Sequence, residues 1–450
     1  MFIPHTESEK ESMLRAIGVQ HIEDLFQDVP ALHRFPSLNL PPAMTEMEIA
    51  AELEDIASNN ETTQELACFL GAGAYNHYIP AAVDSILRRG EFYTAYTPYQ
   101  PEISQGTLQV IFEYQSLIAA LTGMEVCNAS HYDGATAAAE AVVMAYHFYR
   151  GKRKKVLLSP ALNPQYRAVI RTYTQGYSDF VITGDETEQP LLTTPGALIP
   201  LLDADTAIVL VQYPDFFGRV YDLTGLVEAA HAAGALVAVS VNPIALGLFK
   251  APGEFGVDVV TGEGQPLGIP LSFGGPYLGI FASRKEHVRK ISGRLVGETV
   301  DSQGKRAYVL TLTAREQHIR REKATSNICT NQGLMALAAT VYMSLLGKKG
   351  LRQVAELCYH KAHYAAKQIG AVDGYKLCSE DPFFNEFVIQ CPTPIAEINQ
   401  ELLDYGFLGG YDLGNVSPGL KNHMLVAVTE KNSKDQIDGF CNALREVNNG

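Results

Sequence analysis

The chain has 450 residues, too many for one ordinary hydrophobic core, so we expect two or three domains. Its hydrophobic fraction of 46% and charged fraction of 19% are those of a soluble globular protein. A formal net charge of -15 gives a surface that repels phosphate backbones, which argues against nucleic-acid binding.

The start of the chain and its cysteines exclude other classes of protein. The opening residues, MFIPHTESEKESML, lack a basic stretch followed by an apolar one, so we expect no signal peptide and a cytoplasmic location. The longest apolar stretches, such as 206–211 and 235–241, have strand length and are too short to span a membrane. The seven cysteines are scattered without a CxxC pair, so we expect neither a disulfide framework nor a bound metal.

Residues 1–60 are predicted to form short helices and turns. The stretch TEMEIAAELEDIA places apolar residues near helical spacing. We interpret residues 1–60 as a helical arm that packs on something else. An ordinary N-terminal layer of the main domain fits the same pattern equally well.

Residues 61–333 show the alternation of strands and helices that is typical of a large α/β domain. Helices are predicted over 107–122, which Gly123 would cap, and over 133–150. Further helices are expected between the following strands, including one between the second and the third. The strands are continuous apolar runs, which indicates a largely parallel sheet covered on both faces. These runs are KVLLS, DFVITG, TAIVLVQY, ALVAVSV, VDVVTG and YLGIFA.

Residues 334–450 are predicted to form a smaller C-terminal α+β domain. Long helices come first. A strand–helix–strand–helix set follows, in which FNEFVIQ and MLVAVT are the strands.

Two loops carry side chains suited to binding. GAGAYNHYIP, residues 71–80, lacks the third glycine of a dinucleotide-binding fingerprint, so we interpret it as a pocket-lining loop or a structural turn. FYTAYTPYQPEISQG, residues 92–106, places Tyr93, Tyr96 and Tyr99 in a segment with two prolines, which disfavour helix at and just before Pro98 and Pro101. Phenols on a rigid loop combine ring packing with a hydrogen-bonding tip, so this loop is a candidate for binding.

A third candidate is REQHIRREKATSNICTNQ, residues 315–332. Its basic side chains could neutralise an anion, and Thr325, Ser326 and Asn327 add short hydrogen-bonding groups directly after them. A solvated or salt-bridged helix is the alternative in so acidic a protein. The basic residues are Arg315, Arg320, Arg321 and Lys323.

Together, FYTAYTPYQPEISQG, NAS…TAAAEA, FGGPYLGIFA and REQHIRREKATSNICT resemble the N-terminal half of glycine decarboxylase, the P-protein of the glycine cleavage system. The chain length matches the separate alpha subunit of the split form of that enzyme. The resemblance implies an α/β fold of the type I pyridoxal-phosphate-dependent transferases, which are aspartate-aminotransferase-like. It also implies decarboxylation of glycine and transfer of the aminomethyl group to the lipoyl arm of the carrier H-protein.

The residues that such a fold uses to hold pyridoxal phosphate are missing from this chain. Asp133 stands at the helix start that would hold the phosphate, where we expect it to cap the helix and oppose the phosphate charge. The strand end 239–242 has no carboxylate to pair with the pyridine nitrogen. Residues 257–281 contain no Schiff-base lysine, and Gln265 lies near its expected place. Lys250 and Lys285, which flank this stretch, are interpreted as surface residues.

The resemblance therefore implies a shared active site. In the split form, alpha and beta subunits assemble as a heterotetramer, and the beta subunit binds the cofactor covalently. The turn Thr325, Ser326 and Asn327 resembles the one that a neighbouring subunit supplies to the cofactor phosphate. The residues expected to line the partner's pocket are Tyr93, Tyr96, Thr97, Tyr99 and Gln100, with Asn76 and His77 close by.

Three other hypotheses remain open at this point. The chain could be a structural or regulatory pseudoenzyme whose partner already has a complete site. It could be a self-sufficient pyridoxal-phosphate enzyme that uses an unexpected lysine. The third, a nicotinamide-dependent dehydrogenase, rests only on the GAG of residues 71–73.

Overall fold

The computed structural model describes residues 5–129, 131–177, 179–324, 326–328 and 332–449. The chain divides at Glu61 into two compact units, residues 1–61 and 62–450. Within the described residues, no helix combines the length and the apolar composition that crossing a membrane requires.

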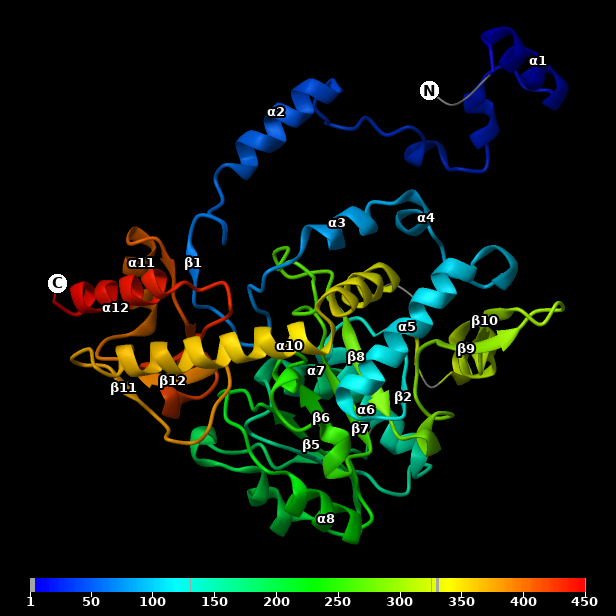
Figure 1. Ribbon diagram of the computed structural model, residues 1–450. Coiled ribbons are helices and arrows are strands. Elements are labelled where there is room, and N and C mark those ends of the chain that lie inside the picture. The colour runs from blue at the N-terminus through cyan, green and yellow to red at the C-terminus, as the bar shows by residue number, and fades with distance from the viewer. Residues whose placement is uncertain (1–4, 130, 178, 325, 329–331, 450) are drawn as a thin grey trace. The chain divides into compact units, whose positions relative to one another are not determined.

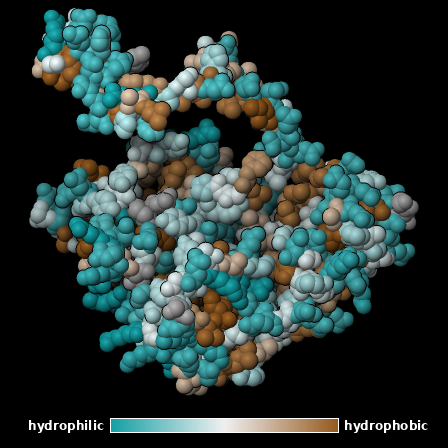
Figure 2. Space-filling model, turned by 180° about the vertical axis from the view of Figure 1, so that it is seen from behind, coloured by the Kyte–Doolittle hydropathy of each residue, from teal (hydrophilic) through white to brown (hydrophobic). Residues whose placement is uncertain are grey.

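The first unit is built from short helices whose apolar side chains are exposed. Helices α1 (Glu7–Ile17) and α2 (Glu46–Ala57) each begin with a capping box, in which a threonine and a glutamate three residues later exchange hydrogen bonds. None of the residues described in this unit is buried. Leu53 and Ile56 of α2, for example, are exposed, and Figure 2 shows hydrophobic side chains among hydrophilic ones along this unit. These helices are therefore specified locally, by their caps.

The second unit contains a seven-stranded sheet of order β2-β8-β7-β6-β5-β3-β4. Figure 1 labels its strands β2, β5, β6, β7 and β8. Strands β3 to β7 run parallel to one another, whereas β8 is antiparallel to both β7 and β2. The expectation of a largely parallel sheet is thus confirmed. The strands are β2 Val126–Cys127, β3 Lys155–Leu158, β4 Val181–Thr183, β5 Thr206–Tyr213, β6 Leu236–Val241, β7 Val259–Glu263 and β8 Gly279–Ser283.

Both faces of this sheet are covered by helices. Successive side chains of a strand point to opposite faces, so Val209 and Val211 of β5 join one core while Ile208 and Leu210 join the other. Helices α5, α8 and α10 fill the first core, and α6 and α7 fill the second. Burial on both faces explains why the strands read as continuous apolar runs. The helices are α5 Gln105–Thr122, α6 Gly134–Phe148, α7 Pro164–Thr174, α8 Thr224–Ala232 and α10 Gly333–Ile369.

Two elements differ from the expectation. The helix predicted between β4 and β5 is wrong, because the chain forms two 3-10 turns there, Pro190–Leu192 and Pro195–Leu201. Prolines at the start of each turn, and Pro200 inside the second, remove backbone N–H donors that an α-helix needs. The sequence also gave no indication of the antiparallel hairpin of β9 (Leu295–Val300) and β10 (Arg306–Thr311).

The C-terminal part forms a four-stranded antiparallel sheet of order β11-β12-β15-β14. Helix α10 connects the two regions, since Ala339 packs in the core of the large sheet and Ile369 in that of the small one. The short strand β1 (Ala67–Cys68) pairs with β13 (Phe407–Leu408) beside this sheet. The remaining elements are β11 Lys376–Leu377, β12 Glu386–Gln390, β14 Tyr411–Asp412, β15 His423–Ala427, α11 Ile395–Asp404 and α12 Lys434–Asn449.

Gly218 lies at a close approach between the two regions, which makes it a test of the fold. Its φ is +86°, and an added Cβ would lie 1.9 Å from the carbonyl oxygen of Glu386. We expect Gly218→Ala to lower the free energy of unfolding by about 3 kcal/mol, from backbone strain and overpacking. Gly225→Ala in α8 is the matched control, because no atom lies within 4 Å of its added Cβ. The control should stabilise by about 1 kcal/mol in urea unfolding, and equal effects would contradict the prediction.

Candidate functional site

The tyrosine-rich loop, residues 92–100, begins in the last residues of the short helix α4 (Gly90–Tyr93) and precedes the 3-10 turn Pro101–Ile103. Proline lacks a backbone N–H, and the residue before it avoids the helical region, so the loop stays extended around Pro98 and Pro101. Its aromatic side chains are unusually open to solvent: Tyr93 is 68% exposed and Tyr96 is 84% exposed. Large apolar side chains gathered on a surface indicate a contact site.

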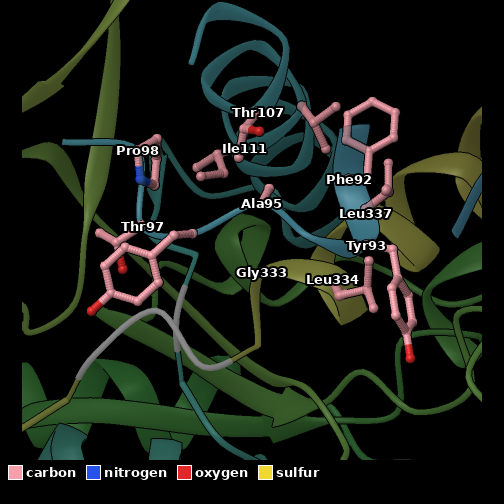
Figure 3. Close-up of a pocket in the computed structure, with 12 residues that line it drawn as sticks. Phe92, Tyr93, Ala95, Thr97, Pro98, Thr107, Ile111, Gly333, Leu334 and Leu337 are labelled. Atoms are coloured by element: carbon pink, nitrogen blue, oxygen red, sulfur yellow. The ribbon is translucent and has the colours of Figure 1, made fainter. Parts of the chain in front are cut away.

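This loop forms one wall of a pocket of about 310 Å³ (Figure 3). The other walls come from α5, which supplies Ile111, and from the start of α10, which supplies Leu334 and Leu337. The lining is predominantly apolar, with phenol and hydroxyl groups at a few places. Three of the predicted residues, Tyr93, Tyr96 and Thr97, therefore line one pocket.

Tyr99, on the same loop, is held by a buried ion pair. The guanidinium of Arg294 donates a hydrogen bond of 2.8 Å to the Tyr99 hydroxyl and lies 5.2 Å from the centre of its ring. Arg294 also pairs with Glu316, at 3.1 Å between Nε and Oε2, and both side chains are buried. The neighbouring Gln100 is exposed and its carbonyl accepts from the N–H of Ile103.

The polar turn that follows the basic run is also fixed by hydrogen bonds of Ser326. The Ser326 hydroxyl donates a hydrogen bond of 2.7 Å to Glu140 of α6 and accepts one from the N–H of Ile328. Burial raises the pKa of Glu140, although its serine contacts oppose that shift. Asn327 is exposed, whereas Thr325 lies outside the described residues.

The basic run itself is short and exposed. Helix α9 covers only Gln317–Arg320. Arg320, Arg321 and Lys323 are all exposed, and the side chain of Arg315 is outside the described part of the structure. The run is therefore accessible, as both the anion-binding and the solvated interpretations require.

Asn76 and His77 are tied to the loop after β15. Lys431 donates a hydrogen bond of 2.9 Å to the Asn76 side chain, and His77 Nδ1 lies 2.7 Å from Glu430. Burial alone would raise the pKa of Glu430, but the contact with His77 and the backbone N–H groups of Tyr78 and Glu430 together outweigh it and lower the pKa to about 2. Among the described residues, no hydrogen bond or ion pair joins Asn76 or His77 to the tyrosine-rich loop.

The start of α6, where a fold of this type would hold a cofactor phosphate, is filled by protein groups. Asp133 caps the helix as expected, accepting the N–H of Thr136 at 2.7 Å. Glu263, at the end of β7, accepts the N–H of Gly134 at 3.0 Å. A Cβ at Gly134 would lie 2.3 Å from the hydroxyl of Tyr166. Two carboxyl groups and a phenol thus crowd a helix start that would otherwise suit an anion.

Gln265, near the expected place of the Schiff-base lysine, is buried and fully engaged. Its side-chain oxygen accepts from the N–H of Tyr75, and its side-chain nitrogen donates to the carbonyls of Tyr75 and Ile269. The cavity beside it, which Glu263, Ser240 and Asn242 line, measures about 20 Å³. Ligand pockets measure roughly 300–1,000 Å³. The small cavity beside Gln265 therefore does not fit pyridoxal phosphate.

Residues 1–444 match the family model of the glycine cleavage system P-protein. The chain belongs to this family. It is 56% identical to a probable glycine dehydrogenase (decarboxylating) subunit 1 of Thermomicrobium roseum, over 99% of both chains. A protein of the same name from Desulforamulus reducens is 53% identical over 97% of both chains. The resemblance drawn from the sequence motifs is thereby confirmed.

Solved structures support the fold. A crystal structure of glycine decarboxylase (P-protein) of the glycine cleavage system, in inhibitor-bound form, superposes with a TM-score of 0.92 at 41% identity. The match covers 99% of this chain and 100% of that one. Glutamate decarboxylase of Lactobacillus brevis shares the fold alone, with a TM-score of 0.68 at 12% identity over 93% of this chain and 96% of that one. The fold is the expected one of type I pyridoxal-phosphate-dependent enzymes.

Sequence reasoning missed Glu263, Glu140 and Arg294. Glu263 had a detectable signal, since it ends a continuous apolar strand, where a buried carboxyl needs nearby donors. Glu140 and Arg294 gave no comparable signal, because their partners lie far away in the sequence.

The buried carboxyl of Glu263 predicts a pH dependence of stability. Burial raises its pKa to about 8 from an ordinary 4.5, despite N–H donors from Gly134, Leu278 and Gln265. The folded protein then binds a proton that the unfolded chain has lost, so stability falls as pH rises from 4.5 to 8. Between pH 7 and 8 we expect a loss of about 1 kcal/mol that Glu263→Gln removes.

Urea unfolding at pH 7 and pH 8 measures this effect. Glu386→Gln is the control, because burial raises the pKa of Glu386 only to about 7. The control substitution should change the dependence of the free energy of unfolding on pH chiefly below pH 7. Parallel pH profiles for wild type and Glu263→Gln would contradict the assignment.

The missing lysine can be replaced by substitution. Gln265→Lys supplies an amine but leaves Glu263 and Tyr166 at the start of α6, so we expect no retention of pyridoxal phosphate after desalting. Absorbance and borohydride reduction of the isolated chain measure this. Gln265→Ala is the control for loss of the Tyr75 contacts. A reducible adduct on the wild-type chain, or on Gln265→Lys alone, would contradict the conclusion that the pocket is closed.

Proposed function

We propose that this chain is one subunit of a glycine-decarboxylating enzyme and completes the active site of a second, beta-type subunit. The observation that carries the proposal is the contrast between two sites. The cofactor pocket of this chain is filled by Glu263 and Gln265, whereas an aromatic pocket stands open at its surface. The relatives are named subunit 1, which implies a partner subunit.

In this proposal the partner holds pyridoxal phosphate covalently, and that group supplies the electron sink for loss of carbon dioxide. The aminomethyl group then passes to the lipoyl arm of the carrier H-protein. The assembly is a heterotetramer of two alpha and two beta chains. The contribution of this chain is to bind, orient and exclude water, and no step of the chemistry runs through its own filled pocket.

The tyrosine-rich loop is assigned to the wall of the partner's pocket. Tyr93 and Tyr96 offer ring faces that keep water away and phenol tips that donate hydrogen bonds. Thr97, Tyr99 and Gln100 continue the same wall. Extension of the loop around its prolines supports this role, because an ordered loop loses less conformational entropy when it binds.

The turn at residues 325–327 is assigned to the partner's cofactor phosphate. The Ser326 hydroxyl already donates to Glu140, so we assign it to holding the turn. Thr325 and the exposed Asn327 are then the side chains proposed to act toward the phosphate. Asn76 contacts Lys431 and His77 contacts Glu430, so we assign both residues to holding the loop after β15.

A non-catalytic regulatory subunit of the same fold is the second candidate. The closed pocket around Gln265 favours it as much as the first, because both require a chain without its own cofactor. The two differ in what the partner can do alone. If the beta-type subunit exchanges glycine carboxyl carbon with bicarbonate at the full rate by itself, the regulatory candidate is correct.

Tyr96→Ala tests the proposed function. Mixed with the beta-type subunit, this variant should form the complex normally but lower glycine–bicarbonate exchange at least tenfold. Loss of about 1.4 kcal/mol of transition-state contact lowers a rate tenfold. Tyr405→Ala is the control, since Tyr405 is also exposed but lies at the end of α11. Full exchange by Tyr96→Ala would refute the assignment of the loop.

A further inference from the structure

The short segment Ser292–Arg294, just before β9, is fastened to the edge of the large sheet. Asn128 donates a side-chain hydrogen bond of 2.6 Å to the carbonyl of Ser292, and the N–H of Ala129 donates to the carbonyl of Arg294. Gly293 between them has a φ of +80°, and an added Cβ would lie 2.7 Å from Asn128 Nδ2. The segment therefore has a tightly defined position.

From one end of this segment, Arg294 reaches the tyrosine-rich loop. It donates to the Tyr99 hydroxyl at 2.8 Å and pairs with Glu316 at 3.1 Å. His318 extends the group, with its ring 5.3 Å from the Tyr99 ring. Hydrogen bonds with charged partners away from water are stronger than neutral ones, so Arg294 fixes Tyr99 firmly.

From the other end, Ser292 reaches the polar turn. Its hydroxyl lies 3.1 Å from Nε2 of His131 and also contacts Glu140. Glu140 accepts the Ser326 hydroxyl at 2.7 Å. His131 is stacked on Phe281 of β8, and burial lowers its pKa to about 3, so this ring is neutral. One hydrogen-bonded path thus runs from the turn to the segment.

Neither Glu140 nor Arg294 can meet a partner directly. Glu140 is 6% exposed and Arg294 is 2% exposed. Their contacts end, however, on the loop and on the turn that are proposed to face the partner. A side chain that reaches a site only through other side chains acts by fixing their geometry.

We propose that Glu140 and Arg294 are positioning residues that hold the tyrosine-rich loop and the polar turn in one joint arrangement through Ser292–Arg294. The inference rests on the proposed function, and it adds that the two contact segments are coupled to each other. Breaking either end should then disturb the partner's cofactor and substrate contacts together. A purely structural role would lower stability and leave those contacts unchanged.

The test uses the complete complex with the beta-type subunit. We expect Arg294→Met to raise the apparent Kd of pyridoxal phosphate, measured by dilution and absorbance, and the KM for glycine, each about tenfold. Arg294→Lys keeps the charge beside Glu316 and should recover part of the loss. Tyr99→Phe, which removes only the acceptor hydroxyl, should shift both constants in the same direction by a smaller factor.

The turn is tested in the same way. Glu140→Ala should raise both constants, whereas Glu140→Gln retains an oxygen for Ser326 and should stay near wild type. Because both residues act through one segment, the double variant Arg294→Met with Glu140→Ala should be less affected than the product of the single effects. Independent defects would multiply instead.

Arg219→Met provides the matched control. Arg219 forms an equally buried pair with Asp215, at 2.7 Å, and donates to the carbonyls of Leu191 and Thr193. It should lower the Tm without changing either constant. If Arg294→Met and Glu140→Ala behave like this control while Tyr96→Ala lowers exchange, the coupling is refuted and the proposed function stands. If Tyr96→Ala is fully active but the two variants still shift both constants non-additively, the coupling stands and the loop assignment fails.

Discussion

The hydrogen bond between the Glu263 carboxyl and the N–H of Gly134 decides what this pocket can hold. Free N–H groups and the helix dipole make the first turn of a helix an anion site. In this chain an internal carboxyl occupies it, with Asp133 capping beside it and Tyr166 against the backbone. A phosphate would have to displace a buried acid that has three backbone donors. The chain therefore combines the absence of a lysine near Gln265 with a helix start that an internal acid occupies.

Closing this pocket also joins the two regions of the second unit. The backbone N–H of Tyr75 donates to the side-chain oxygen of Gln265, which follows β7 of the large sheet, and the Tyr75 hydroxyl donates to Glu386 of the small sheet at 2.7 Å. Ala72 donates its N–H to the same carboxyl. Ligand pockets occur preferentially where domains meet, and at this meeting point the structure has a buried hydrogen-bond network instead of an open pocket. These hydrogen bonds link the two regions beneath the segments on the surface of the chain.

The sequence predicted much of this because several signals are local. Continuous apolar runs indicated covered parallel strands, and the glycine after residue 122 ends α5 in the left-handed conformation. Absence of a lysine is a fact of composition. The hairpin 295–311 was missed although the turn before Lys305 contains Gly304, with a φ of +77°. The expected helix after β4 failed because three prolines outweighed the general alternation of strands and helices.

The site was less predictable for a physical reason. A stretch rich in tyrosine can be recognised in a sequence, but the side chains that fix its tyrosines in place are distant in the chain. Arg294 meets Tyr99 across 195 positions, and Ser326 meets Glu140 across 186. Such pairs form only after the sheet has placed its strands, so no spacing rule reveals them. Buried ionisable groups thus lie away from the closed pocket as well, with Arg294 in contact with the loop and Glu140 in contact with the turn.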